Sequence, residues 1–512
     1  MSTTPLLADT LVVGAGWSGL IASLKLAQAG KRVVLLEARK RIGGRAFTHS
    51  WNDATPLEDN SRNATNEPVH AVDFGCSWIH GYNEGNPVKE LAQRYGVKVH
   101  VPKSTPSQII GPHGPLAADL AAKLQANLSA AQSAATSQAR TSAGRLSKGD
   151  GQATDPSLAS FLLAPASPLF TGLETSEEKH LAIALARSLH IPLGTSLEQI
   201  ALTWTGFEDN FAGTDGAPEG GFSRLINLVA KELTSLGVEI RTGHVVEQIT
   251  NSLAQQQQQQ QQQQQCVEVS AKDEEGKGKD VVYTAKSALV TIPLAVLKET
   301  HGNLFKPKLP ARKQDIIDRV NVGNLNKVLL TYETPWWPLE TGTFFVLPTS
   351  SSSPSASPSL ADTFRETTLI VSSLCAPHGL PGSTNSLLVM VGAQAAKDIE
   401  QYTRLEVAEA LHDYLYARLK NPSDTTQPKL RHTFYSRWGQ QPFTRGATTT
   451  PVVIGDPSNS PLDFEELSRP VWDGRLSFAG EACDLNHRGS VAGAVLSGER
   501  AAKSILKVLS KL

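Results

Sequence analysis

Residues Asp9–Ala38 read DTLVVGAGWSGLIASLKLAQAGKRVVLLEA, and the pattern of this stretch predicts the fold. Leu11–Val13 is a short apolar run typical of a strand, and Leu20 and Leu24 follow at the spacing of one helix face. Val33–Leu36 is a second apolar run without interruption, as expected for a strand buried on both faces of a parallel sheet. Strand, helix and strand form a βαβ unit, so we predict an α/β fold with a parallel sheet.

The turn between the first strand and the helix carries G-x-G-x-x-G at Gly14, Gly16 and Gly19. Gly14 allows the tight turn, Gly16 lets the backbone approach a pyrophosphate, and Gly19 lets helix and strand pack closely. The helix N-terminus then faces the phosphate charge. Glu37 ends the second strand, where a carboxylate can accept both hydroxyls of an adenosine ribose and repels a 2′-phosphate, which argues against NADP. A tight turn without a ligand is the alternative.

Two further stretches favour FAD over NAD as the dinucleotide. Gly43–Arg45, in EARKRIGGRAFT, offers paired glycines and an arginine to the pyrophosphate or the flavin. Glu481, in FAGEACD, follows a predicted strand, where its carboxylate could hold the ribityl chain. The helix predicted to begin near Ser490 has small residues at 492–494, so its N-terminus can approach the ring and its dipole can stabilise negative charge on the reduced flavin.

The composition limits the class of protein. A chain of 512 residues exceeds the usual size of one core, so two domains are expected. A net charge of -1 with 19% charged residues gives no electrostatic case for binding nucleic acid or an acidic membrane surface. The sequence shows neither an apolar run long enough to span a membrane nor a signal-peptide pattern. The 4 cysteines form no CxxC pair, so we expect neither a disulfide scaffold nor a metal site.

Three stretches of biased composition look like insertions. They are residues 131–157, rich in Ala, Ser, Gly, Thr and Gln; the glutamine tract 255–265; and the Ser/Pro-rich stretch 348–362. Such compositions cannot bury a core, so we predict mobile surface loops. The glutamine tract lies between two strand-like segments, HVVEQITNSL and CVEVSAKD, and is therefore predicted to extend the tip of a hairpin.

Lys327 stands inside VGNLNKVLL, an apolar run from Val322 to Leu330 that is typical of a strand. One interpretation is that its side chain points to solvent and its stem covers apolar surface. The other is that it points inward, which costs desolvation free energy unless the ammonium finds a partner.

Together these motifs resemble the flavin-containing amine oxidases, the family of monoamine oxidases, polyamine oxidases and lysine-specific histone demethylases. The resemblance covers most of the chain outside the three insertions. It implies a Rossmann-like FAD-binding domain of the GR2 type, formed by residues 1–80, 218–299 and 433–512, and an interleaved α+β substrate domain, formed by 81–217 and 300–432. The motifs that carry it, in the family's order, are VVGAGWSGL, LLEARKRIGGRAFT, DFGCSWIHG, GNPVKELAQRYG, GGFSRLINLVA, VTIPLAVLK, YETPWWP, RWGQQPF, FAGEACD and VAGAVLSGERAA.

The resemblance also implies residue roles at the cofactor. In the family a lysine on a substrate-domain strand points at flavin N5 and holds a water there; Lys327 matches it and is expected to be catalytic. Val246 matches the residue that contacts the adenine through its backbone. Ala447 stands where some monoamine oxidases attach the flavin through a cysteine, so the FAD is expected to be noncovalent. The expected FAD contacts are Gly14, Ala15, Gly16, Ser18, Gly19, Glu37, Ala38, Arg39, Gly44, Arg45, Gly75, Ser77, Trp78, Val246, Trp438, Gly480, Glu481, Ser490 and Val491.

The substrate residues favour a polyamine. His80, in SWIHG, looks most like the polyamine oxidases; its imidazole could bind a secondary amine and help to keep the nitrogen deprotonated, or it is simply a core histidine. Thr448 and Ser490 match the positions of two aromatic side chains in monoamine oxidases, and the threonine departs from most members. Glu208 and Asp209 are candidate carboxylates for a polycation, with solvated surface acids as the alternative.

We therefore expect an FAD-dependent polyamine oxidase. It would oxidise a secondary amine of spermine, spermidine or their acetylated forms to an imine and then an aldehyde, with O2 reduced to hydrogen peroxide. The alternatives are an oxidase of a monoamine or another amine-bearing metabolite, and a nonenzymatic flavoprotein. Ser510, Lys511 and Leu512 match the SKL address of peroxisomal import, so the import receptor is an expected partner and the peroxisome the expected location; an ordinary helix end is the other interpretation.

Overall fold

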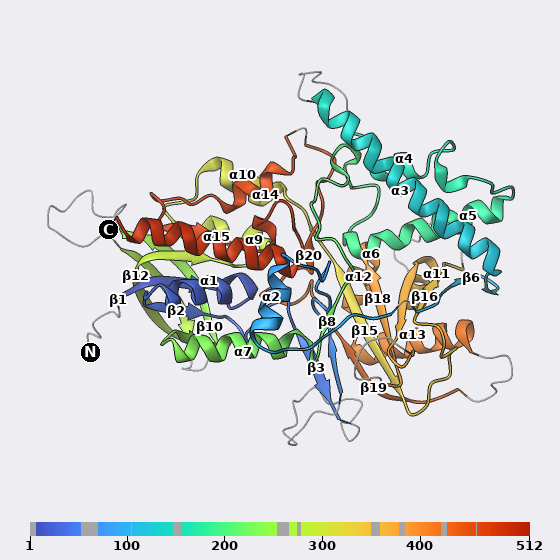
Figure 1. Ribbon diagram of the computed structural model, residues 1–512, viewed down its shortest axis with the longest axis horizontal. Helices are drawn as coiled ribbons and strands as arrows, with labels where there is room; N and C mark the ends of the chain where they lie inside the picture. The colour runs from blue at the N-terminus through green and yellow to red at the C-terminus, as the bar shows by residue number, and fades with distance from the viewer. Residues whose placement is uncertain are drawn as a thin grey trace.

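The computed structural model has two large sheets, with α15 and α1 beside one and α13 beside the other (Figure 1). The residues that the structure describes are 7–52, 70–103, 105–146, 155–252, 266–273, 278–349, 359–377, 384–420, 427–456 and 458–511. Among them, no helix is both long and apolar enough to cross a bilayer. The fold is mixed α/β, as the sequence predicts.

The first sheet contains the βαβ unit. Strand β1 (Leu7–Val13) lies parallel to β2 (Val33–Leu36), with α1 (Trp17–Gln28) between them in the chain, which confirms the prediction. On its other edge β1 pairs in parallel with β12, and β2 pairs in parallel with β9. The sheet runs in the order β13-β10-β11-β12-β1-β2-β9, with β21 on β12. Its further strands are β9 (Glu239–Arg241), β10 (His244–Asn251), β11 (Val267–Asp273), β12 (Lys279–Val290), β13 (Phe305–Lys306) and β21 (Leu476–Phe478).

Small residues let the helices of this half pack closely. A Cβ added at Gly498 on α15 would lie 2.5 Å from the carbonyl oxygen of Ser18 on α1, so a larger residue would push the two helices apart. Leu20 of α1, Phe222 of α7 and Val495 of α15 share one buried core. The helices of this half are α1, α7 (Gly221–Ser235), α9 (Leu294–Leu304), α10 (Ala311–Arg319), α14 (Leu462–Ser468) and α15 (Val491–Leu509).

The predicted hairpin around the glutamine tract is present. Strands β10 and β11 pair antiparallel, from His244 opposite Asp273 to Asn251 opposite Val267, so the two strand-like segments are neighbours. The tract itself, 255–265, lies outside the described residues.

The second sheet has the order β19-β15-β18-β17-β16-β6-β7. Lys327 lies on its strand β15, between β19 and β18. The strands are β6 (Ser107–Gly111), β7 (Gly114–Pro115), β15 (Leu325–Tyr332), β16 (Thr343–Val346), β17 (Leu369–Ser373), β18 (Ser386–Gly392) and β19 (Leu430–Tyr435). The helices of this half are α3 (Ala118–Leu146), α4 (Leu158–Leu162), α5 (Ser176–Ala186), α6 (His190–Leu193), α11 (Leu360–Glu366), α12 (Ala393–Asp398) and α13 (Arg404–Leu419).

Shorter elements join the two halves. Helix α2 (Pro87–Arg94) begins at Asn86, whose side chain accepts a hydrogen bond from the Val88 N–H and caps the helix. Three strand pairs complete the structure: β3 (Thr48–Trp51) with β4 (His70–Asp73), β5 (Val99–His100) with β8 (Ala217–Pro218), and β14 (Val322–Gly323) with β20 (Thr448–Thr449).

The loop predicted over residues 131–157 is wrong for its first part. Residues 131–146 continue the helix α3, in which Ala131 and Ala135 are completely buried, as is Leu124 about two and three turns before them. Alanine has the highest helix propensity, and this stripe of small residues packs against α4 and α5, so the stretch does bury a core. In the Ser/Pro-rich stretch, Ser359 caps α11, which begins at Leu360; residues 147–154 and 350–358 lie outside the described residues.

Two of the predicted domain boundaries fall inside helices or strands of the structure. The boundary at 299/300 falls inside α9, and β13 beyond it pairs with β10 of the first sheet. Ile316 and Ile317 of α10 also pack into the core of that sheet, although the sequence of α10 looked like the start of a new region. The boundary at 432/433 falls inside β19, which belongs to the second sheet.

Candidate functional site

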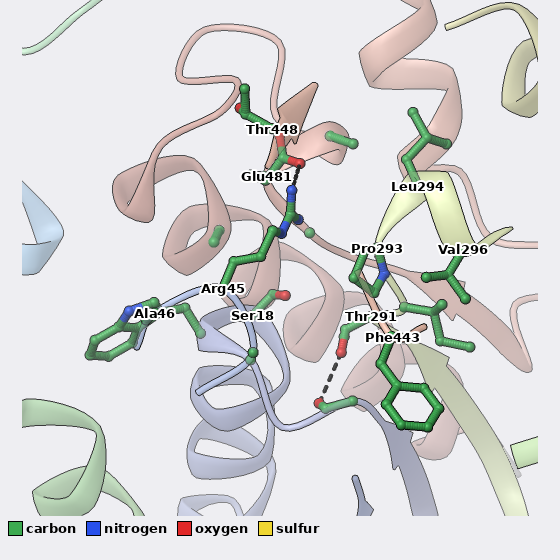
Figure 2. A pocket seen from close by; sticks show the side chains of 18 of the residues that line it. Ser18, Arg45, Ala46, Thr291, Pro293, Leu294, Val296, Phe443, Thr448 and Glu481 are labelled. Atoms are coloured by element: carbon green, nitrogen blue, oxygen red, sulfur yellow. Dashed lines mark hydrogen bonds and ion pairs between the residues drawn. The ribbon is translucent and has the colours of Figure 1, made fainter. Parts of the chain in front are cut away.

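One cavity of about 680 Å³ is lined by residues from both sheets. From the first half it receives the glycine turn, the end of β2 and the start of α15; from the second half it receives β15, β17 and β18. Figure 2 shows part of this lining, with Ser18 near the start of α1 and Arg45 directed at Glu481. Its size and its concave, mixed lining are typical of a cofactor or ligand site.

The glycine turn has the geometry that a dinucleotide needs. Gly14 has a φ of +106°, a conformation that side chains rarely allow. A Cβ at Gly19 would lie 1.9 Å from the carbonyl oxygen of Gly14, so Gly19 is required for α1 to pack on the turn. A Cβ at Gly16 would meet no atom within 4 Å, and Gly16 lines the cavity, so this is the side from which a phosphate can approach the backbone.

The far end of the cavity is formed by Glu37 and its neighbours. Glu37 is buried; its carboxylate accepts the N–H of Ala15 at 2.8 Å and that of Arg39 at 3.0 Å. The Arg39 guanidinium lies over the Phe443 ring at 5.5 Å, and burial lowers its pKa. Val246 lines the same end, next to a register shift in the β10–β11 pairing that diverts the strand there.

Arg45 and Glu481 form an ion pair across the middle of the cavity, 2.7 Å from Nη1 to Oε1 (Figure 2). Glu481 also accepts hydrogen bonds from the Thr449 hydroxyl and from the Gly489 N–H at 3.1 Å. Burial raises the pKa of Glu481, but the Arg45 charge and the Thr449 hydroxyl outweigh it and hold that pKa below its ordinary value. The carboxylate is therefore charged and fixed near neutral pH.

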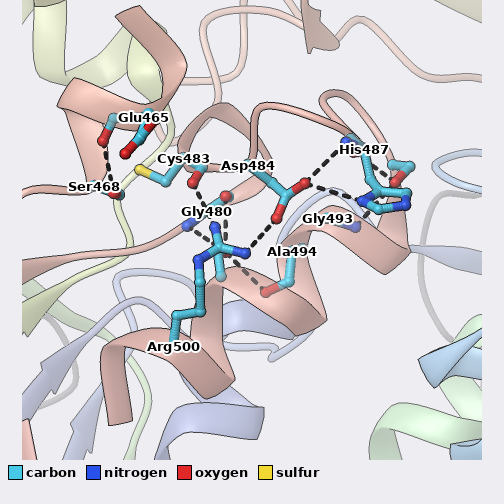
Figure 3. Close-up of polar contacts among 11 residues, drawn as sticks. Glu465, Ser468, Gly480, Cys483, Asp484, His487, Gly493, Ala494 and Arg500 are labelled. Atoms are coloured by element: carbon cyan, nitrogen blue, oxygen red, sulfur yellow. Dashed lines mark hydrogen bonds and ion pairs between the residues drawn. The ribbon is translucent and has the colours of Figure 1, made fainter. Parts of the chain in front are cut away.

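The loop after Glu481 is tied to α15 by polar contacts (Figure 3). Asp484 accepts the N–H of His487 at 2.8 Å and Nη1 of Arg500 at 2.5 Å, while Nη2 of Arg500 donates to the carbonyl of Cys483 at 2.7 Å. Ser490, at the helix start, accepts the Gly493 N–H at 3.0 Å. These contacts hold Glu481 and the N-terminus of α15 in one rigid unit that lines the cavity.

Lys327 points inward, so the solvent-facing interpretation does not hold. Its side chain is 7% exposed, and Nζ donates to the carbonyls of Asp73 at 3.0 Å and Gly75 at 2.8 Å and to the Ser77 hydroxyl. Burial lowers the pKa of Lys327 to about 8, although the Asp73 carboxylate and Cys76 oppose the shift. A lysine amine in the cavity wall that can lose its proton near neutral pH is suited to proton transfer.

The sequence interpretation missed Asp73, which lies beside Lys327. Its carboxylate accepts the Thr48 hydroxyl at 2.6 Å and the Phe222 N–H at the start of α7 at 3.2 Å. Burial raises the pKa of Asp73 to about 6, against these hydrogen bonds and the Lys327 charge. Asp73 ends β4 and is the first residue of the motif DFGCSWIHG, so its place in that motif was the available signal.

His80 lies at the rim of the cavity rather than in the core. Its side chain is 61% exposed, and Nδ1 lies 2.8 Å from Oδ2 of Asp215. Oδ1 of Asp215 accepts the Gly81 N–H at 3.0 Å, and Nδ2 of Asn86 donates to the carbonyls of His80 and Gly81. In the neutral imidazole, Nδ1–H therefore donates to Asp215 and Nε2 is left as an acceptor. Asp215 was not predicted, because its partner is 135 positions away in sequence.

The candidate substrate residues divide into two groups. Thr448 and Ser490 line the cavity, and the Ser490 hydroxyl is engaged as the cap of α15. Glu208 is instead ion-paired with Arg488 and does not belong to the cavity lining. A substrate would have to displace Arg488 to reach it.

Most predicted cofactor residues meet at the cavity. Ala15 and Gly19 do not line the cavity. The Ala15 N–H donates to the Glu37 carboxylate, and Gly19 lets α1 pack on the glycine turn. Those in the lining are Gly14, Gly16, Ser18, Glu37, Ala38, Arg39, Gly44, Arg45, Gly75, Ser77, Trp78, Val246, Trp438, Gly480, Glu481, Ser490 and Val491. The open face of Gly16, the acid at the end of β2 and the start of α15 lie around one cavity, an arrangement that would suit a dinucleotide cofactor.

Fold and site thus place a glycine turn, a buried acid at the end of β2 and an ionisable lysine around one cavity. A family model described as flavin containing amine oxidoreductase matches residues 17–506, so the chain belongs to this family of enzymes and the flavin is the cofactor that the family implies. The resemblance stated from the motifs is confirmed at this level.

Individual relatives are distant. Lysine-specific histone demethylase 1 homolog 1 of Arabidopsis thaliana is 27% identical over 509 residues, which cover 98% of this chain and 52% of the relative. Polyamine oxidase 2 of Arabidopsis thaliana is 26% identical over 507 residues, 98% of this chain and 89% of the relative. Polyamine oxidase 3 of Oryza sativa subsp. japonica is 26% identical, with 90% of its length covered. The chain spans about half the length of the demethylase homologues it matches.

Proposed function

We propose that this enzyme is an FAD-dependent oxidase of secondary amines, with polyamines or their acetylated forms as substrates. The observation that carries the proposal is that one cavity holds both the dinucleotide cradle around Gly16 and Glu37 and the buried amine of Lys327. Polyamine oxidase 2 and polyamine oxidase 3 are similar to this chain over 98% of its length, which supports this substrate class.

The chain's own residues would hold FAD noncovalently. The open face at Gly16 and the N–H groups at the start of α1 would bind the pyrophosphate, and Glu37 would bind the ribose. Arg45, oriented by its ion pair with Glu481, would neutralise negative charge in the middle of the site. When bound, the flavin supplies a hydride acceptor for the amine and passes two electrons to O2.

The overall reaction converts R–CH2–NH–R′, O2 and water into the aldehyde R–CHO, the primary amine of R′ and hydrogen peroxide. His80 can accept a hydrogen bond from a substrate N–H at Nε2, because Asp215 occupies its Nδ1–H. Lys327, whose ammonium already donates to Asp73, Gly75 and Ser77, can take up and release a proton at the cavity wall. Thr448 and Ser490 leave room for a flexible aliphatic chain.

A peroxide-coupled assay on the purified holoenzyme tests the proposal. We expect spermine, spermidine or N-acetylspermine to give equal amounts of aldehyde and hydrogen peroxide, with benzylamine and a dimethyl-lysine peptide inactive. Turnover of the peptide alone would replace the polyamine proposal with a demethylase, and turnover of benzylamine alone would replace it with a monoamine oxidase.

We also propose the peroxisome as the location, because the product is hydrogen peroxide and residues 510–512 read SKL. Ser510 and Lys511 are exposed beyond α15, and Leu512 lies outside the described residues. Deleting the three residues from a fluorescent fusion is expected to move it from peroxisomes to the cytosol. Continued import would contradict the role of this tripeptide.

A further inference from the structure

A row of side chains crosses the second sheet where it forms the cavity floor. Lys327 on β15 is paired with Met390 on β18, and Met390 is paired with Ile370 on β17. Directly paired residues project from the same face of a sheet, and all three line the cavity. Since neighbouring strands lie about 4.8 Å apart, the row leads about 10 Å away from Lys327.

The surroundings of this row are apolar. Leu325 precedes Lys327 by two positions on the same strand, so it shares the same face and also lines the cavity. Ile191 of α6 forms a wall: a Cβ on Gly392 of β18 would lie 2.5 Å from the Ile191 Cα, so α6 rests directly on the strand beside the row. We refer to Leu325, Met390, Ile370 and Ile191 as the apolar slot.

The polar groups that could bind a charged arm of the substrate lie outside the apolar slot. His80 and Asp215 stand at the rim, where both side chains are exposed to solvent. An ammonium at the rim keeps its hydration and gains a carboxylate, whereas an ammonium over Met390 and Ile370 would exchange its water for methyl and methylene groups. The rim at His80 therefore favours a charged substrate arm, and the apolar slot favours an uncharged one.

We propose that the apolar slot binds one arm of the substrate, that this arm is uncharged, and that Met390 and Ile370 determine this specificity. The inference rests on the proposed function and narrows it: the substrate is a secondary amine with one cationic arm at the rim and one apolar or neutral, for example acylated or alkylated, arm in the slot. We define the bleaching efficiency as the rate constant for flavin bleaching divided by the dissociation constant of the amine. Each methylene added to that arm is expected to raise this efficiency about fourfold, until the slot is full.

A matched pair of substrates tests the inference. Spermidine and N-pentyl-1,3-diaminopropane differ only in that a terminal ammonium of the first is a methyl group in the second. In anaerobic mixing with the holoenzyme, the pentyl compound is expected to bleach the flavin at least about tenfold more efficiently. Equal or better efficiency of spermidine overturns the inference while leaving the proposed function intact. If neither amine bleaches the flavin, the proposed function fails and the inference fails with it.

Variants of the slot provide the second test. Ile370→Asp is expected to shift the preference at least about tenfold toward spermidine, because the carboxylate pairs with its terminal ammonium. Ser372→Asp is the matched control, since Ser372 lies two residues along β17 on the same face but outside the cavity lining, and its preference is expected to be unchanged. If Ile370→Asp does not fold, Met390→Gln, which conserves volume, is expected to lower the efficiency with the pentyl compound. An unchanged preference in a folded slot variant overturns the inference.

Discussion

The sequence predicts that the Lys327 ammonium needs a partner, and the structure identifies which groups those partners are. An ammonium in the run VGNLNKVLL needs either solvent or a partner, and the structure supplies partners in Asp73, Gly75 and Ser77. These oxygens come from a segment 250 or more positions away, so the sequence predicted the need for partners but not their identity. Asp73 and Asp215 were missed for the same reason: an acidic residue acquires its role from what folding places beside it.

Lys327→Met tests the protonation of the buried lysine through stability. The unfolded lysine titrates at its ordinary pKa of 10.5, the folded one at about 8, so between these values the unfolded chain binds more protons and the wild type gains stability as pH rises. The free energy of unfolding of the wild type, relative to the variant, is expected to rise by about 3 kcal/mol from pH 8 to pH 10.5. The measurement is urea unfolding of both holoproteins, with the exposed Lys503→Met as the control. A difference that does not change with pH would contradict the burial of a titrating amine.

Asp215→Asn tests whether Asp215 sets the tautomer of His80. The amide can donate to Nδ1, which leaves Nε2 carrying the proton and removes the acceptor for a substrate N–H. We expect the KM for the secondary amine to rise about three- to tenfold, the value of a hydrogen bond between neutral groups, with kcat and flavin content nearly unchanged. The measurement is steady-state kinetics of Asp215→Asn and the wild type. Glu219→Gln is the control, because Glu219 is an exposed acid paired with Arg224. An unchanged KM would show that Asp215 only holds the turn at Gly81.

At the scale of elements, the βαβ unit was fully predictable and α3 was not. The glycine turn is specified by its own residues. Gly14 has a positive φ that favours glycine, and a Cβ at Gly19 would collide with the carbonyl oxygen of Gly14. Residues 131–146 have the composition of a linker, yet their alanines fall at helical spacing and meet a ready-made apolar surface on α4 and α5. Composition alone cannot separate a flexible stretch from a helix whose buried side chains are small, because both are poor in large apolar residues.

Gly16→Ala separates the cofactor role of the turn from its structural role. Its Cβ would meet no protein atom within 4 Å, so the fold is expected to be retained, but the methyl group would stand where the phosphate approaches. We expect flavin content, read from the visible spectrum, to fall at least about tenfold. Gly302→Ala, which also has open space and lies far along α9, is the matched control. Full flavin content in Gly16→Ala would place the pyrophosphate elsewhere.

At the scale of the molecule, the described residues form two large sheets whose strands alternate along the sequence, and both sheets line the cavity. The presence of two interleaved halves was predictable from the order of the motifs. The residues at which each half begins and ends were harder to predict, because β13 and β19 are short strands whose sheet membership depends on neighbours distant in sequence. The same dependence explains why Met390 and Ile370 were not predicted: they become neighbours of Lys327 only through strand pairing.

Anaerobic bleaching of the bound flavin by spermine, N-acetylspermine and benzylamine tests most directly whether this enzyme is an FAD-dependent oxidase of secondary amines. We expect rapid bleaching by at least one polyamine, with benzylamine inert, and loss of most of that rate in Lys327→Met with its flavin retained. Bleaching by benzylamine alone, or no bleaching by either polyamine, would contradict it.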